Sequence, residues 1–419
     1  METLGLVLVI LFVLFLRQPL LVLLFSATAY AHMVWGRGHI EDIVEDMWVG
    51  IDKDVILSIP LFVLCGNVMT RGAIATRLIG IMAAVTRPVP GGLAVAGILS
   101  CAVFASINGS SIVTMLAIGS VILPALEKAG YDLKFSLGAI MTGGTLGIII
   151  PPSIPMIIYA LVTESSLTDM FLAGVGPGLL ITSVLVAYAI WVNRRMPTSR
   201  LDWQELTAAV RSGIWALLMP VILLGGIYSG FFTPTESAAV ALAYAMFIEV
   251  FVHRQMKLTD FYHVVLETSK VGGALFPVLA VALSISILVT EHRLPQQLVA
   301  VFQTYIDSPM TFMVVVTAML LMVGLLLDTI SAILILAPLL APIGAAYGID
   351  KVTFGIIMII TLEIGYLTPP VGMNLIVAMT AFKQNFGLLC RAAMPYIALM
   401  LFCLAIVVWQ PSITTVFLR

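Results

Sequence analysis

Charge is what this chain has least of. Asp, Glu, Lys and Arg make up only 10% of its 419 residues, against about a quarter in an ordinary soluble domain. Hydrophobic residues account for 61%, and the mean hydropathy is +1.13. This composition excludes a sizeable soluble domain and predicts an all-α, multi-pass protein embedded in a lipid bilayer. No basic patch stands out, which argues against nucleic acid as a partner.

Cysteine and the common catalytic motifs are scarce as well. The four cysteines lie in apolar runs without C-x-x-C spacing, so we expect structural thiols rather than disulfides. The five histidines fall near the ends of apolar segments or in loops and are not spaced as metal ligands. The chain has no P-loop, no H-E-x-x-H motif and no paired-carboxylate motif, so we expect no enzymatic activity.

Helix-breaking residues are what the chain does have, and they concentrate in residues 91–165. An apolar arm leads to the polar tip Asn108-Gly109-Ser110-Ser111, a second arm returns, and a long apolar segment is then interrupted at Pro151-Pro152. Proline removes a backbone donor and frees a carbonyl one turn earlier. Within lipid, such a break is tolerated only where protein buries it or it lines a cavity. The pattern predicts a re-entrant hairpin and a broken helix with carbonyls free to bind a cation; a packing kink is the alternative.

The same pattern occurs a second time at a constant offset of 218 residues. The matched positions are Pro124 and Pro342, Gly130 and Gly348, Asp132 and Asp350, Gly147 and Gly365, and Pro151-Pro152 and Pro369-Pro370. The tip Ser110-Ser111 matches Asp328-Thr329. A single offset without gaps aligns helix-breaking residues of one segment with helix-breaking residues of the other. The chain therefore contains an internal duplication of the kind found in membrane transporters.

Segment lengths and the repeat together predict five regions. Residues 1–90 should form scaffold helices and a first interfacial arm, and residues 91–165 the first transport-core repeat. Residues 166–308 should contain further scaffold helices, a polar linker (193–211) and a second arm. Residues 309–383 should form the second core repeat, and residues 384–419 a terminal helix. Five crossings separate the broken helices 134–164 and 352–382, so the repeats should be inverted. The N-terminal apolar run lacks the basic start and cleavage site of a signal peptide, and we expect a retained first helix.

The distribution of cationic residues predicts the orientation. With both hairpins re-entrant, fifteen Lys and Arg residues fall on one side and five on the side that holds both termini. The positive-inside rule makes the richer side cytoplasmic. Both termini should therefore lie outside the cell membrane.

The duplicated core itself lacks cationic side chains. No Lys or Arg occurs within 88–127, 135–193, 294–350 or 352–382. A small anionic substrate held there must rely on helix N-termini, amides, hydroxyls and co-bound cations. This favours cation-coupled transport, although a neutral substrate would fit the same pattern.

The tips and breaks offer oxygen ligands without nitrogen or sulfur, which suits Na⁺ rather than a transition metal. Ser110-Ser111 and Asp328-Thr329 would also cap the second helix of each hairpin, and capping alone is the alternative reading of these side chains. Glu363 is an acid inside an apolar segment and is therefore a functional candidate; pairing with a polar group across a domain boundary is equally open. Asn374 follows the second break and is a candidate substrate contact.

Six stretches resemble the large membrane subunit of tripartite ATP-independent periplasmic (TRAP) transporters. They match in order and span nearly the whole chain: Asn108–Ser111, Leu123–Asp132, Gly143–Pro155, Gly230–Ala238, Leu327–Thr329 and Leu367–Asn374. The resemblance implies an elevator-type ion-transporter fold with inverted repeats, two re-entrant hairpins and two broken helices in the bacterial inner membrane. It also implies two partners, a small four-helix membrane subunit and a periplasmic substrate-binding protein.

The resemblance further implies two or more Na⁺ ions at the tips and breaks. The first site would use Asn108, Ser110, Ser111, Gly147, Ile150 and Pro152. The second would use Gly324, Asp328, Gly365, Thr368 and Pro370. The expected substrate contacts are Asn108, Gly109, Ser110, Ser153 and Asn374. The expected function is Na⁺-coupled import of a small organic carboxylate; the alternatives are a stand-alone dicarboxylate or ion symporter or exchanger of the same fold, and a passive channel.

Overall fold

The computed structural model describes residues 2–16, 18–36, 39 and 41–418, and this part of the chain is helical without strands. The first 90 residues form α1 (Glu2–Phe15), α2 (Leu20–Val34), α3 (Asp42–Ile51), α4 (Asp54–Arg71) and α5 (Ile74–Thr86). Among the positions used for the orientation, Arg17, Arg37 and Arg419 lie outside the described residues. Nine helices of the described chain are long and apolar enough to cross a membrane, which confirms the multi-pass prediction.

The two core repeats have the same sequence of elements. The first contains α6 (Gly92–Asn108), α7 (Ser111–Lys128), α8 (Leu133–Ile149) and α9 (Ile154–Thr163). The second contains α15 (Pro309–Gly324), α16 (Thr329–Ala346), α17 (Lys351–Leu367) and α18 (Met373–Phe382). Each repeat is therefore a helical hairpin followed by a helix broken at its Pro-Pro pair, as predicted.

Residues that lie 218 positions apart also have the same roles at the helix N-termini. Asp132 accepts a hydrogen bond from the backbone of Phe135 at 2.9 Å, and Asp350 accepts the equivalent bond from Thr353 at the same distance. The glycines that precede these caps, Gly130 and Gly348, have φ angles of 79° and 76°. Both Pro-Pro bonds are cis. The duplication is therefore structural as well as sequential.

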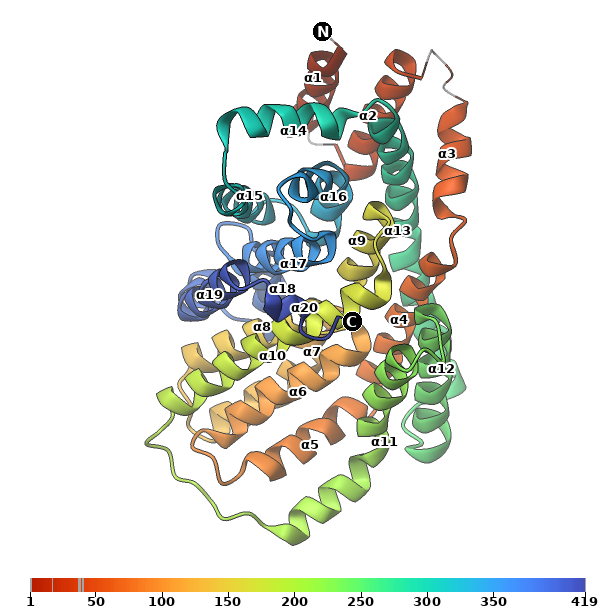
Figure 1. Cartoon of the computed structure of the whole chain (residues 1–419). Coiled ribbons are helices and arrows are strands. Elements are labelled where there is room, and N and C mark those ends of the chain that lie inside the picture. The colour runs from red at the N-terminus through yellow and green to blue at the C-terminus, as the bar shows by residue number, and fades with distance from the viewer. Residues whose placement is uncertain (1, 17, 37–38, 40, 419) are drawn as a thin grey trace.

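The two repeats interlock at their second halves. After its break, α9 packs against α16 of the other repeat, and α18 packs correspondingly against α7. The hairpin helices α6 and α7 both pack against α8, while α15 and α16 pack against α17. Nearly all of α8, α9 and α17 is buried. The centre of the molecule is thus built from the two broken helices, with a hairpin on each (Figure 1).

The remaining helices surround this core. They are α10 (Leu167–Val192), α11 (Trp203–Tyr228), α12 (Pro234–Phe247) with a π-helical end (Ile248–Val252), α13 (Leu258–Glu291), α14 (Leu294–Tyr305), α19 (Phe386–Trp409) and α20 (Ser412–Thr415). One layer consists of α2, α3, α4, α11, α12 and α13, on the right of Figure 1. In contrast, α10 and α19 pack against the core helices α8 and α17.

Contacts between distant segments agree with the predicted sidedness. The hydroxyl of Tyr159 donates to the carbonyl of Lys351 at 2.8 Å, and Thr353 bonds to Thr414 near the C-terminus at 2.8 Å. At the other end of the core, Tyr396 donates to the carbonyl of Phe135 at 3.0 Å. These contacts therefore join segments that the predicted layout places on the same side of the membrane. Which side is periplasmic stays a prediction.

The polar linker expected over 193–211 was too long. In the structure α11 already begins at Trp203, because the Asp202 carboxylate accepts hydrogen bonds from the backbone N–H groups of Gln204 and Glu205 at 2.9 and 3.2 Å. The first turns of α11 are polar and exposed, so hydropathy alone did not reveal them. The polar stretch 36–53, by comparison, contains the short amphipathic helix α3.

Candidate functional site

The first hairpin tip lies directly on the first helix break. Gly109 joins α6 to α7 with a left-handed φ of 65°, and its carbonyl accepts a hydrogen bond from Ile154 at 3.3 Å. A Cβ atom on Gly109 would lie only 2.9 Å from the carbonyl oxygen of Pro152. The sequence predicted that tip and break face one another, and in the structure they are in contact.

Gly147 gives the tip room to approach α8. A Cβ atom there would lie 2.4 Å from the backbone oxygen of Ser110 and 2.6 Å from the hydroxyl of Thr114. One turn after Gly147 stands Pro151, which has no N–H to offer its carbonyl. Ser110, Gly147 and Pro152 of the predicted first cation site are therefore brought together. Ile150, also predicted there, turns its side chain towards Gly178 in α10.

Asn108 holds this tip in shape. Its amide oxygen accepts hydrogen bonds from the backbone of Ser110 at 2.8 Å and from Thr114 at 3.2 Å, while its amide nitrogen donates to the carbonyl of Phe104 at 2.8 Å. The side chain is almost fully buried. Ser110 caps α7 by accepting from Val113 at 3.5 Å, so the predicted capping role is present.

The second tip meets the second break through two glycines. A Cβ atom on Gly365 would lie 2.6 to 3.0 Å from the backbone of Gly324, so α15 and α17 cross there in backbone contact. Asp328 caps α16 and accepts from the backbone of Ser331 at 3.0 Å. The hydroxyl of Thr368 donates to the carbonyl of Ile364 at 2.6 Å. Unlike the first break, which is buried, this one leaves Pro370 exposed.

The two tips also meet each other, which the sequence did not predict. A cavity of about 150 Å³ lies between them. Its walls include Gly109, Ser110 and Ser111 from the first tip, Asp328 and Thr329 from the second, and Tyr366 beside the second break. Both predicted cation sites therefore border one small central cavity. Within the described residues, no group of three or more His, Cys, Asp or Glu could hold a metal ion.

Glu363 and Asn374 form a polar cluster behind this cavity. The amide nitrogen of Asn374 donates to the hydroxyl of Ser111 at 2.7 Å and to the carboxylate of Glu363 at 3.2 Å. Both side chains are fully buried. Asn374, predicted to contact substrate, thus links the second repeat to the first tip. Ser153, predicted for the same role, is also buried, and its hydroxyl has no hydrogen-bond partner in the described structure.

The scaffold reaches the first tip through α4. Gly66 lies so close that a Cβ atom on it would approach the Cβ of Asn108 to 2.8 Å. The same helix packs against α6, α7 and α9. Sequence reasoning missed this contact, and the only signal was a glycine in the middle of an apolar segment.

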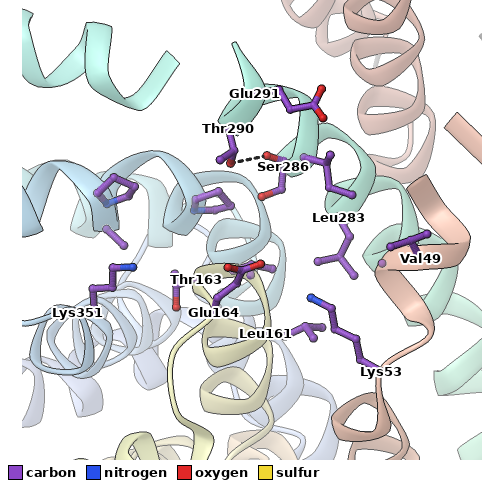
Figure 2. A pocket seen from close by; sticks show the side chains of 16 residues that line it. Val49, Lys53, Leu161, Thr163, Glu164, Leu283, Ser286, Thr290, Glu291 and Lys351 are labelled. Atoms are coloured by element: carbon purple, nitrogen blue, oxygen red, sulfur yellow. Dashed lines mark hydrogen bonds between the residues drawn. The ribbon is translucent and has the colours of Figure 1, made fainter. Parts of the chain in front are cut away.

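A larger crevice separates the core from the scaffold on the side of Lys351. Its volume is about 590 Å³, and its walls come from α3 and α13 on the scaffold and from α9, α16 and α17 on the core. Four charged residues line it, namely Lys53, Lys351, Glu164 and Glu291. Figure 2 shows Lys53 and Glu164 pointing into the crevice from opposite walls. No two of the four form an ion pair in the described structure.

Comparison with known proteins places this architecture in a family. The model of the DctM component of tripartite ATP-independent periplasmic transporters matches residues 6–413. The chain belongs to the DctM family. It is similar to the C4-dicarboxylate TRAP transporter large permease protein DctM of Pseudomonas aeruginosa, with 41% identity over 86% of this chain and 85% of that protein. It is also similar to the ectoine TRAP transporter large permease protein TeaC of Halomonas elongata, with 33% identity over 97% and 96% of the two chains.

A solved structure supports the fold alone. The Alcanivorax borkumensis YdaH transporter has a TM-score of 0.57 at 13% identity, and the likeness covers 87% of this chain and 86% of that one. As a DctM-family protein, the chain is the large permease component of a membrane transporter, which agrees with the absence of enzymatic motifs from its sequence. The predicted family and fold class are confirmed.

Proposed function

We propose that this protein imports a small organic carboxylate together with Na⁺, as a secondary transporter working by an elevator movement. The central cavity carries the proposal. Both hairpin tips line it with hydroxyl, carboxylate and backbone oxygens, alongside apolar side chains such as Ile148 and Ile154 on either side of the first break. The Lys and Arg residues of the core repeats, namely Lys128, Lys134, Lys351 and Lys383, all stand at helix ends. Oxygen-only surroundings fit Na⁺, and an anion in a core without cationic side chains gains from a co-bound cation.

The residues present fit two sodium sites. Asn108, Ser110, Ser111, Gly147, Ile150 and Pro152 would form the first, and Gly324, Asp328, Gly365, Thr368 and Pro370 the second. The substrate would lie between the tips, near Gly109, Ser153 and Asn374. The N-termini of α9 and α18 follow the two breaks and favour negative charge there. The names of the relatives point to C4-dicarboxylates or ectoine as the first compounds to test.

The crevice between core and scaffold supports an elevator movement. It leaves space beside α9, α16 and α17, while Gly66 of the scaffold helix α4 packs closely on Asn108 of the first tip. Small residues at such an interface allow close packing that can slide. We propose that the two core repeats move together against this scaffold, in an inner membrane with both termini periplasmic. A small four-helix membrane subunit and a periplasmic binding protein would complete the transporter.

Uptake into proteoliposomes tests the proposal. The chain, its small subunit and its binding protein would be reconstituted, and labelled C4-dicarboxylate or ectoine uptake measured with Na⁺, K⁺ or choline outside. We expect accumulation only with an inward Na⁺ gradient and a binding protein, with a Hill coefficient for Na⁺ above one. Equal uptake in choline would refute Na⁺ coupling. Full uptake without a binding protein would favour a stand-alone carrier, and uptake that stops at equilibrium a passive channel.

A further inference from the structure

Glu363 is a buried acid that the proposed sodium sites do not use. It lies in α17 with its side chain fully buried, and one carboxylate oxygen accepts from Asn374 at 3.2 Å. The other oxygen, together with the amide oxygen of Asn374 and the hydroxyl of Thr329, has no hydrogen-bond partner among the described residues. The hydroxyls of Ser111 and Thr329 are neighbours of the same carboxylate. One oxygen of the buried acid and one oxygen on each of two nearby residues are thus unpaired.

No cationic side chain of the described chain pairs with Glu363. None of the ion pairs involves it, and the nearest Lys or Arg in sequence are Lys351 and Lys383, at the two ends of its broken helix. Isolating a carboxylate from water is costly unless a positive charge accompanies it. No side chain of the described core supplies that charge, so the carboxyl is either protonated or balanced by bound cations.

The position of Glu363 relates it to both proposed sites at once. Ser111 belongs to the first tip, Thr329 follows Asp328 in the second, and Gly365 stands two residues after Glu363. The other acids of the two core repeats, Glu127, Asp132, Glu164 and Asp350, lie at or near helix ends away from the tips and breaks. Asp328 and Glu363 are therefore the two acids in the middle of the core, and their two negative charges would match two sodium ions.

We infer that Glu363 is the fixed negative charge shared by both sodium sites, and that Asn374 couples it to the first tip. This inference rests on the proposed Na⁺ coupling and adds a residue that neither site contains. A charge shared in this way makes each cation site sensitive to the same side chain. Losing it should weaken Na⁺ binding by at least about tenfold, since unit charges within roughly 10 Å at a dielectric constant near 20 interact that strongly.

Glu363→Gln separates charge from shape. Glutamine has the same size and can still accept the hydrogen bond from Asn374, but it carries no charge. The readout is the thermal unfolding midpoint of the purified protein as NaCl replaces choline chloride at constant ionic strength. For wild type we expect stabilisation by Na⁺ but not by choline. For Glu363→Gln we expect the half-saturating Na⁺ concentration to rise at least about tenfold, with no loss of stability in choline.

Two further variants complete the test. Glu363→Asp keeps the charge and should bind Na⁺ within about threefold of wild type, which corresponds to well under 1 kcal/mol. Glu127→Gln removes an exposed acid at the end of α7 and should match wild type. If Glu363→Gln yields no folded protein, Glu363→Asp decides alone, and wild-type-like Na⁺ binding supports the shared charge.

The possible failures are distinguishable. A wild-type protein without Na⁺-specific stabilisation would overturn both the inference and the Na⁺ coupling. A wild-type response that Glu363→Gln reproduces would overturn the inference alone, because the carboxyl would then already be neutral in the native protein. Glu363→Asp binding as weakly as Glu363→Gln would show that shape, not charge, matters at this position.

Discussion

At the residue scale, glycines allow the helices of the transport core to approach one another at the tips and breaks. Gly147 lets the Ser110 carbonyl reach α8, and Gly324 and Gly365 let α15 and α17 cross in backbone contact. Backbone oxygens can converge on a cation only where no side chain holds the helices apart. Glycine at these positions is therefore required for the close approach, and through it for the proposed sodium sites.

Gly147→Ala and Gly365→Ala should damage both stability and transport. The added Cβ atoms would lie 2.4 Å from the Ser110 oxygen and 2.6 Å from Gly324, so the tips must move away. We expect each variant to lose about 1–3 kcal/mol of stability, as overpacked cores do, together with most Na⁺-driven uptake. Thermal unfolding and proteoliposome uptake measure the two effects.

The matched control is Gly273→Ala in α13, where a Cβ atom would meet nothing within 4 Å. Alanine in an open helical position stabilises by about 0.5–1 kcal/mol relative to glycine. This variant should therefore be at least as stable as wild type and fully active. Wild-type uptake in Gly147→Ala or Gly365→Ala would show that the close approach is dispensable.

At the element scale, the two broken helices have equivalent sequences but different surroundings. The first break is buried, with Pro151, Pro152 and Ser153 inaccessible and α10 packed alongside, whereas Pro370 at the second break is exposed. The first break is thus enclosed by α4 and α10, whereas the second break lies at the surface of the described structure. Equivalent repeats in unequal surroundings fit the proposed movement, in which the site is closed on one side of the membrane while it is open on the other.

Replacing either Pro-Pro pair by Ala-Ala should heal its helix. Proline costs about 3 kcal/mol in a helix interior and alanine is the best helix former, so membrane insertion and folding should be at least as good. Alanine N–H groups would then bond to the carbonyls of Gly147 or Gly365, one turn before each pair, in the second case beside the Thr368 N–H that already bonds to Gly365 at 2.9 Å. We expect Na⁺-driven uptake to be lost in both double mutants while the protein stays folded.

Pro220→Ala in α11 is the control for these double mutants, because that proline lies within an unbroken scaffold helix. Its uptake should equal that of wild type. A folded Pro151-Pro152 or Pro369-Pro370 double mutant with unchanged Na⁺ dependence would mean that the break in question only relieves packing.

At the scale of the whole molecule, the predicted orientation can be tested by labelling. The Lys and Arg distribution places Ser199 inside and Ser308 outside. In the structure Ser199 lies beside Arg87, in the loop between α10 and α11, and Ser308 caps α15 next to α14. The α10–α11 loop and the α14–α15 connection lie towards opposite ends of Figure 1.

The test applies an impermeant thiol reagent to cells whose outer membrane has been removed and whose inner membrane is intact. The reagent should modify Ser308→Cys and should spare Ser199→Cys until the inner membrane is permeabilised. Three of the four native cysteines are buried and Cys390 is half-buried, so the unsubstituted protein serves as background. The reverse labelling pattern would invert the proposed topology and place both termini in the cytoplasm.

The sequence by itself determined the membrane class, the inverted repeat, both hairpins and both breaks. These features depend on hydropathy and on Gly, Pro and Asp acting within a few residues, as the equivalent caps Asp132 and Asp350 show. The N-cap residue Asp202 could have indicated the start of α11 in the same way. Hydropathy placed this start too late because the first turn of the helix is polar.

The surroundings of the tips and breaks could be read only from the three-dimensional structure. That the two tips share one cavity, that Gly66 of the scaffold packs on Asn108, and that Asn374 reaches Ser111 all depend on residues 42 to 263 positions apart. Apolar periodicity fixes which face of a helix is buried, not which helix covers it. Buried polar partners are chosen by three-dimensional packing, because only there does an unpaired group in a dry core find its donor or acceptor.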